Sequence, residues 1–337
     1  MHWADLERFP ESSGKWETIE GSKNVVVGEA NARKKAARWF PLNTTLYASP
    51  ASQRFSLAIC FPELADFVHR RYVLKFRLLL FFLIFLLAVL IGLSIAYDSY
   101  TLFSKSYGFV GILFIVFFFE YEVFVKSKTK LVELSLFFHW ILSRKSYLFW
   151  MLFGMTLCSG VFQVVYLTKI GSLESLVTEY GVYYRSANSG EWWRYFLGSF
   201  VHRDFAHWLA NFFLLLIAAI LAGPFSRISL IFYFFIFIAV SAYVVQFPLY
   251  GVAPDALVGI SGGVFGLYGW IIGNGFRYRR QFPQSYYLHV AMFVLPNIFI
   301  AAILNPNSSS EAHIVGLLVG AIFGVAGASE DCKAAST

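Results

Sequence analysis

Charged residues are scarce in this chain. Asp, Glu, Lys and Arg together account for 14% of its 337 residues, whereas hydrophobic residues account for 58%. Soluble domains carry about 25% charged residues, so this sequence has too little charge to cover the surface of a soluble protein of its length. The composition excludes an ordinary soluble domain and predicts a protein that crosses a membrane several times.

Cysteine is also scarce. The three cysteines, Cys60, Cys158 and Cys332, lie far apart and lack the spacing of metal ligands. They therefore predict neither a disulfide framework nor a metal site, and no organic cofactor is expected. The first 66 residues contain no hydrophobic core, so no cleavable signal peptide is expected either.

Long hydrophobic runs, by contrast, are frequent. A helix that crosses a bilayer needs about 20 apolar residues, and eight runs come near that length. Several of the later runs are short and begin with polar residues, which is typical of helices that start below the membrane surface around a wet cavity. The expected spans lie at about 76–97, 107–125, 147–167, 206–222, 228–247, 261–274, 286–304 and 312–328.

The net charge of +7 is modest, and the basic residues gather in alternate loops. Basic loops usually face the cytoplasm, so both termini are expected there, and the loops at 168–205, 248–258 and 305–311 are expected on the other side. This clustering favours a topological role over nucleic-acid binding. The basic residues are Arg70, Arg71, Lys75, Arg77, Lys126, Lys128, Lys130, Arg144, Lys145, Arg227, Arg277, Arg279 and Arg280.

The expected fold is an all-α polytopic membrane protein with eight helices. Residues 1–66 form a small N-terminal cytoplasmic segment in this interpretation, with a candidate strand at Asn24–Gly28. This segment also contains a basic cluster, Arg33, Lys34, Lys35 and Arg38. The cluster fits a solvated surface better than contact with nucleic acid or lipid. Residues 67–146 hold two additional transmembrane helices, 147–329 a six-helix core, and 330–337 a cytoplasmic tail.

Three polar residues, His207, Ser261 and His313, stand near the starts of spans that enter from the same, non-cytoplasmic side. Ionisable groups inside a membrane are costly and usually functional. A serine hydroxyl becomes a nucleophile when a base lies within hydrogen-bond reach, and His313 can accept its proton. Because the only nearby acid is Glu311 in the preceding loop, we expect a Ser–His dyad. Taken singly, Ser261 is also explained as a small helix-packing residue and His313 as a histidine that faces water.

A second pair, His207 and Asn211, is four residues apart and so shares one helix face. Both side chains can donate hydrogen bonds, and with the backbone N–H of Ser261 they could surround a tetrahedral oxyanion. The alternative is that the pair joins helices through polar contacts. His202, five residues before His207, is expected to support the site.

Glycines are frequent in the sixth and eighth spans. Gly316, Gly320 and Gly324 recur every four residues in the eighth. Small residues at this spacing let two helix backbones approach closely. The helices that carry Ser261 and His313 are therefore expected to touch.

As a set, these motifs resemble those of the rhomboid family of intramembrane serine proteases. The matching pieces are EWWR at 191–194, the residues at 202, 207 and 211, GISG at 259–262 and AHIVGLLVG at 312–320. Their order and spacing fit a six-helix rhomboid core over roughly 147–328. The resemblance implies that Ser261 is the nucleophile, His313 the base, and His207 and Asn211 the oxyanion donors.

The resemblance also gives supporting roles to Gly259, Trp193 and Arg194, of which the last two would brace the membrane-embedded loop between the first two core helices. In the family a tyrosine often follows the serine by four residues and stacks on the catalytic histidine. Phe265 occupies that position here. The stacking is expected to survive without the hydroxyl.

The implied function is that of an intramembrane serine endopeptidase, which cleaves peptide bonds in or near transmembrane segments. Its expected partners are transmembrane protein substrates and the lipid bilayer, with no nucleic acid. The alternative is an inactive rhomboid-like factor that binds membrane proteins or serves their quality control; such relatives typically lack the serine or the histidine. A small-solute transporter would show internal repeats and charged midplane residues, which the core lacks. The expected location is a bacterial inner membrane.

Overall fold

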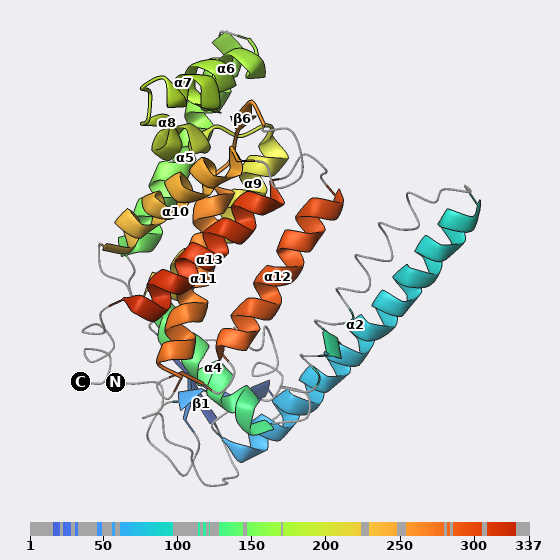
Figure 1. Ribbon diagram of the computed structural model, residues 1–337. Helices are drawn as coiled ribbons and strands as arrows, with labels where there is room; N and C mark the ends of the chain where they lie inside the picture. The colour runs from blue at the N-terminus through green and yellow to red at the C-terminus, as the bar shows by residue number, and fades with distance from the viewer. Residues whose placement is uncertain are drawn as a thin grey trace. The chain divides into compact units, whose positions relative to one another are not determined.

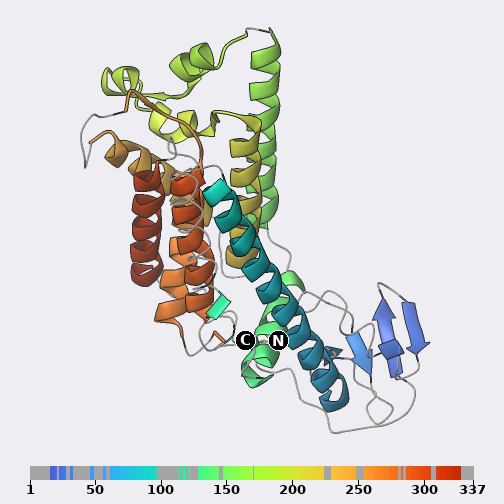
Figure 2. The ribbon, with the colours of Figure 1, turned by 90° about the vertical axis from the view of Figure 1, so that its right-hand side faces the viewer.

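The chain divides into two compact units (Figures 1 and 2). The first comprises 1–143 with 282–284 and 336–337, and the second comprises 144–281 and 285–335. The computed structural model describes residues 16–20, 23–27, 31–32, 46–48, 56–57, 61–96, 114, 117–118, 121, 128–143, 147–169, 171–223, 229–247, 254–279, 282–283, 286–304 and 309–327.

The first unit contains a small antiparallel sheet with the strand order β2-β1-β3-β4. Its strands are Trp16–Glu20 (β1), Lys23–Val27 (β2), Leu46–Ala48 (β3) and Ser56–Leu57 (β4). Only two residues separate β1 from β2 in the sequence, a spacing typical of a tight hairpin. The candidate strand at 24–28 corresponds to β2, but the other three strands of the sheet were not expected from the sequence. The described part of the chain is therefore mainly helical, with this sheet and one short strand pair in the second unit.

The first unit also contains two helices, α2 (Pro62–Ala96) and α4 (Lys128–Ser143). At about 1.5 Å per residue, α2 is about 52 Å long, whereas the hydrocarbon core of a bilayer is about 30 Å thick. The helix α2 begins at Pro62, before the expected span at 76–97. The span was predicted from apolar residues alone, whereas the helix also includes the polar residues that precede them. The region of α4 was expected to be a loop, because its apolar run is too short to cross a membrane. The expected span at 107–125 lies almost entirely outside the described residues, so the count of eight spans stays a prediction.

The second unit is helical, and its described part contains six long apolar or glycine-rich helices. They are α5 (Tyr147–Lys169), α9 (Phe205–Ala222), α10 (Ser229–Val245), α11 (Ser261–Arg277), α12 (Tyr286–Leu304) and α13 (Ser310–Ala326). Three described helical segments are long and apolar enough to cross a membrane: 64–89 of α2, the whole of α5 and the whole of α9. The protein is thus a polytopic membrane protein. Three helices of the second unit, α9, α11 and α13, carry the residues described below as the candidate site.

Short elements fill the connection from α5 to α9. They are α6 (Leu173–Tyr180), β5 (Val182–Tyr183), α7 (Tyr184–Asn188), α8 (Arg194–Leu197) and the 3-10 turn η4 (Gly198–Phe200). In Figure 1 α6, α7 and α8 gather at one end of α5. The strand β5 pairs with β6 (Ala256–Leu257), which lies just before α11. This pairing ties the connection to the chain segment that leads into α11.

α11 is the buried centre of the second unit, since every residue from Ser261 to Ile271 is buried. It lies side by side with α13 in both views (Figures 1 and 2). Their backbones are in direct contact, because a Cβ at Gly316 would lie 2.0 Å from the Gly262 oxygen. A side chain larger than hydrogen at this position would therefore force the helices apart. The close approach of these two helices follows from the glycines at four-residue spacing.

Candidate active site

Ser261 is the first residue of α11, and its side chain is buried. The preceding Gly259 has a φ of 101°, a left-handed conformation that favours glycine. The N–H of Gly259 donates to the Val201 oxygen at 2.7 Å. The loop before Ser261 is thus held at β6 and again at Gly259. The serine lies at the start of a helix, where backbone N–H groups have no helical partner.

His207 and Asn211 lie one turn apart in α9, close to that loop. A Cβ at Gly259 would lie 2.7 Å from Cε1 of His207, 2.9 Å from its Nε2 and 3.4 Å from Nδ2 of Asn211. Both side chains are thus packed against the backbone two residues before Ser261, which leaves no room for any residue other than glycine. Nδ1 of His207 and Nδ2 of Asn211 are buried without a hydrogen-bond partner. Two potential donors therefore lie unused beside the serine loop.

His207 lies in the first turn of α9, where the N-cap residue Asp204 holds its backbone. The Asp204 carboxylate accepts a hydrogen bond from the His207 N–H at 2.7 Å and caps the helix. That hydrogen bond lowers the pKa of Asp204 below its usual value, against a smaller opposing effect of burial. The carboxylate is therefore ionised at neutral pH. Its negative charge then also interacts favourably with the positive N-terminal end of the helix dipole. This cap was not expected from the sequence.

His313 lies in the first turn of α13 and is buried. Its imidazole stacks on the ring of Phe265, with centroids 4.5 Å apart and planes at 28°. α13 meets α11 beside Ser261, since a Cβ at Gly262 would lie 3.6 Å from the Ala312 oxygen. The helix starts that carry Ser261 and His313 are therefore adjacent.

The described residues contain no hydrogen bond between the Ser261 hydroxyl and the His313 imidazole. Nδ1 of His313 is buried without a partner, so no described carboxylate orients the ring. Catalytic hydrogen bonds often form fully only when substrate is bound. The geometry accommodates a dyad in which the ring of Phe265, rather than a third polar residue, orients the histidine.

His202 is fully buried just before α9. Its Nδ1 donates to the Phe200 oxygen at 2.9 Å, and its ring meets His207 edge-on at a centroid distance of 5.3 Å. Burial lowers the pKa of His202 to about 3, helped by the neighbouring His207. The ring is therefore neutral at physiological pH, and it packs against His207 without adding charge to the site.

The geometry can be compared with known families. Residues 189–330 match the family model described as Rhomboid domain. This stretch of the chain is therefore identified as a rhomboid domain. The matched residues include Ser261, His313, His207 and Asn211. The helix α5 precedes the matched residues in the sequence. A search of curated proteins found no match.

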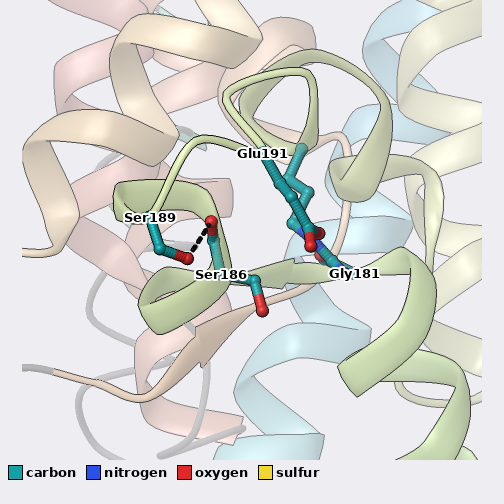
Figure 3. A network of polar contacts seen from close by, with 5 residues as sticks. Gly181, Ser186, Ser189 and Glu191 are labelled. Atoms are coloured by element: carbon teal, nitrogen blue, oxygen red, sulfur yellow. Dashed lines mark hydrogen bonds and ion pairs between the residues drawn. The ribbon is translucent and has the colours of Figure 1, made fainter.

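The rhomboid domain begins in a polar network that includes Trp193 and Arg194. The Arg194 side chain is buried; its Nε pairs with Glu191 at 2.5 Å and its Nη1 donates to the Gly181 oxygen at 2.9 Å. Its guanidinium also lies over the Trp193 ring, 4.9 Å from the centroid. Figure 3 shows Glu191 and Gly181 from different turns of this connection, next to each other. These contacts join α8 to the end of α6.

A further hydrogen bond closes the neighbouring turn, where the Ser189 hydroxyl donates to the Ser186 oxygen at 3.0 Å (Figure 3). The phenol of Tyr184, in the same connection, donates to the Ala242 oxygen of α10 at 2.8 Å. The connection between α5 and α9 is therefore fastened both to itself and to the helix bundle.

Gln163 of α5 was not expected from the sequence to take part in the site. Its Nε2 donates to the His202 oxygen at 2.5 Å, and its Oε1 accepts from the His202 N–H at 2.9 Å. The available signal was an amide in the middle of an apolar span, since buried polar groups in membranes are costly unless bonded. A cavity of about 180 Å³ lies beside it, lined by Ser159, Phe162, Gln163, Tyr180, Trp193, Leu197, Phe200 and Val201. Among the described residues, no three His, Cys, Asp or Glu side chains are placed to hold a metal ion.

Proposed function

We propose that this rhomboid protein is an intramembrane serine endopeptidase that uses a Ser261–His313 dyad. One observation carries the proposal: His207 and Asn211 pack against Gly259, two residues before Ser261, while the helix start that bears His313 meets the same end of α11. A nucleophile, a base and two hydrogen-bond donors thereby surround one short stretch of backbone. These are the components that acyl transfer requires.

In the proposed reaction, the Ser261 oxygen attacks the carbonyl carbon of a peptide bond and His313 accepts the hydroxyl proton. The carbonyl oxygen becomes an oxyanion, which the His207 and Asn211 side chains and the backbone N–H of Ser261 stabilise. The C–N bond then breaks as His313 returns the proton to the leaving amine. Water, activated by His313, hydrolyses the acyl-enzyme and restores the serine. Donors that are in place before charge develops are worth most in such a site.

The proposed substrates are transmembrane proteins cleaved in or near their membrane segments. In this proposal, 147–329 forms the protease core, 67–146 contributes two additional transmembrane helices, 1–66 is a cytoplasmic segment and 330–337 a cytoplasmic tail. The basic loops support cytoplasmic termini. The active site then opens towards the non-cytoplasmic side of a bacterial inner membrane.

The test is cleavage of a panel of reporter transmembrane segments by purified protein in proteoliposomes. Wild type and the Ser189→Ala variant, which loses an exposed hydroxyl and its hydrogen bond to the Ser186 oxygen, are expected to cleave at the same rate. Ser261→Ala is expected to be inactive with an unchanged unfolding temperature. Cleavage by Ser261→Ala at the wild-type rate would refute the dyad. A wild-type protein that binds the segments and cleaves none would instead identify a binding factor.

A further inference from the structure

We propose that Gln163 of α5 is a positioning residue that aligns the oxyanion donors with the serine loop. The inference rests on the proposed protease function and adds to it a residue outside 189–330, the stretch that matches the rhomboid family model. Gln163 is buried in α5, the helix before the connection. Among the residues that the structure describes, its amide forms hydrogen bonds to His202 alone, one to each polar group of that residue's backbone.

The two hydrogen bonds require an amide. The His202 N–H donates to Oε1 of Gln163, and Nε2 of Gln163 donates to the His202 oxygen. Only a side chain with a donor and an acceptor at its end can make both bonds. Because the amide nitrogen and the amide oxygen each bond a different backbone atom of His202, both the position and the orientation of the His202 backbone relative to α5 are restrained.

The neighbouring residue connects the same segment to the serine loop. The Val201 oxygen accepts the hydrogen bond of the Gly259 N–H at 2.7 Å. The dipeptide Val201–His202 is therefore held by α5 through one residue and holds the loop before Ser261 through the other. A shift of this dipeptide would move Gly259 directly.

The same dipeptide leads into α9, and His207 follows His202 by five residues. Their rings are in edge-on contact, and His207 packs against Gly259. Gln163 is thus connected to both halves of the oxyanion site, the donor side chain and the backbone of the serine loop. A displacement of about 1 Å can lower an enzymatic rate by about 100-fold, so loss of the two bonds should affect the chemical step more than binding.

The variant that tests the inference is Gln163→Met. Methionine has a similar length and no hydrogen-bonding amide, and the cavity beside position 163 gives its flexible side chain space. The matched control is Tyr184→Phe, which also removes a buried hydrogen bond from a side chain to a backbone oxygen. That bond joins the connection to α10 and does not involve Val201 or His202. Both variants keep all residues of the proposed dyad and oxyanion site.

The first measurement is steady-state cleavage in proteoliposomes. Gln163→Met is expected to lower kcat by about 10- to 100-fold with KM within about twofold of wild type. Tyr184→Phe is expected to keep the wild-type kcat. The conservative Gln163→Asn, which keeps the amide on a shorter side chain, is expected to fall between the two. A wild-type kcat in Gln163→Met, or equal losses in Gln163→Met and Tyr184→Phe, would overturn the inference while leaving the protease intact.

The second measurement does not depend on activity. Amide hydrogen exchange should become faster in Gln163→Met at both 199–206 and 257–263, because the two segments are joined through Val201 and Gly259. Tyr184→Phe should leave both segments protected. Unchanged exchange in the serine loop of Gln163→Met would overturn the inference even if no protease substrate were found. An inactive wild-type protein with the expected exchange pattern would count against the proposed function alone.

Discussion

The ring of Phe265 lies over the imidazole of His313, with centroids 4.5 Å apart and planes at 28°. The two residues belong to α11 and α13, so the stack joins the helix of the serine to the helix of the histidine. Because Nδ1 of His313 has no partner, this ring contact is the described interaction that restrains the imidazole. The ring of Phe265 makes this contact without a hydroxyl group.

This relationship predicts the effect of changes at position 265. Phe265→Tyr is expected to keep the ring and to cleave at a rate within about twofold of wild type. If His313 is the base of the proposed dyad, Phe265→Ala should leave its ring free to rotate and lower kcat by about tenfold or more, because the imidazole would spend less time aligned with Ser261. The measurement is kcat for both variants in the same reporter assay. Equal activity of the alanine and tyrosine variants would show that the stack has no catalytic effect.

The oxyanion site predicts a loss of turnover rather than of binding. In the proposed mechanism, His207→Ala and Asn211→Ala each remove one oxyanion donor, whose hydrogen bond is strongest in the transition state. Loss of one such donor typically lowers the rate by about 100- to 1,000-fold, and less where several donors share the charge. The measurement is kcat and KM separately for both variants. A raised KM with normal kcat would show that the two residues serve helix packing.

The close contact of α11 and α13 predicts opposite outcomes for two glycine substitutions. In Gly316→Ala the new methyl group would lie 2.0 Å from the Gly262 oxygen and must push the helices apart. Overpacking of this kind costs about 1–3 kcal/mol, and the displacement should also abolish cleavage. Gly154→Ala in α5 meets nothing within 4 Å and should stabilise the helix by up to about 1 kcal/mol. Unfolding in detergent and the reporter assay check both, and a stable, active Gly316→Ala would contradict the packing.

The cap on α9 predicts a pH-dependent stability that depends on Asp204. Asp204→Ala removes the cap and should lower stability by about 1 kcal/mol at pH 7, whereas Asp204→Asn keeps a capping side chain and should be near wild type. Since the His207 N–H lowers the pKa of Asp204 below its usual value, the contribution of the charge is complete above that usual value and is lost as the pH falls through the lowered one.

The asparagine variant has no carboxylate to protonate and should lack this acid-dependent loss. The measurement is the unfolding free energy of all three proteins at pH 7 and near pH 3. Parallel losses in wild type and Asp204→Asn on acidification would show that another group is responsible.

Much of the protein could be predicted from its sequence because a membrane restricts composition strongly. Scarce charge and long apolar runs indicated a polytopic membrane protein, and the spacing of HxxxxHxxxN, GISG and AHIVGLLVG indicated the rhomboid family, which the match over 189–330 confirms. The glycines at four-residue spacing indicated the contact of α11 with α13. These features could be predicted because each depends on residues close together in the sequence or on a strict helical repeat.

Other features required the tertiary structure. Hydropathy marks apolar runs and not helix ends, so it missed the polar beginning of α2, the short helix α4 and the sheet around β2. The hydrogen bonds from Gln163 to His202, 39 residues apart, and from Gly259 to Val201 join segments that no local pattern relates. Which side chains touch Gly259 depends on how α9 packs against α11, and packing is decided by the fit of whole helices. The sequence alone determined which chemical groups the protein carries, and only the tertiary structure decided which backbone atoms hold those groups in place.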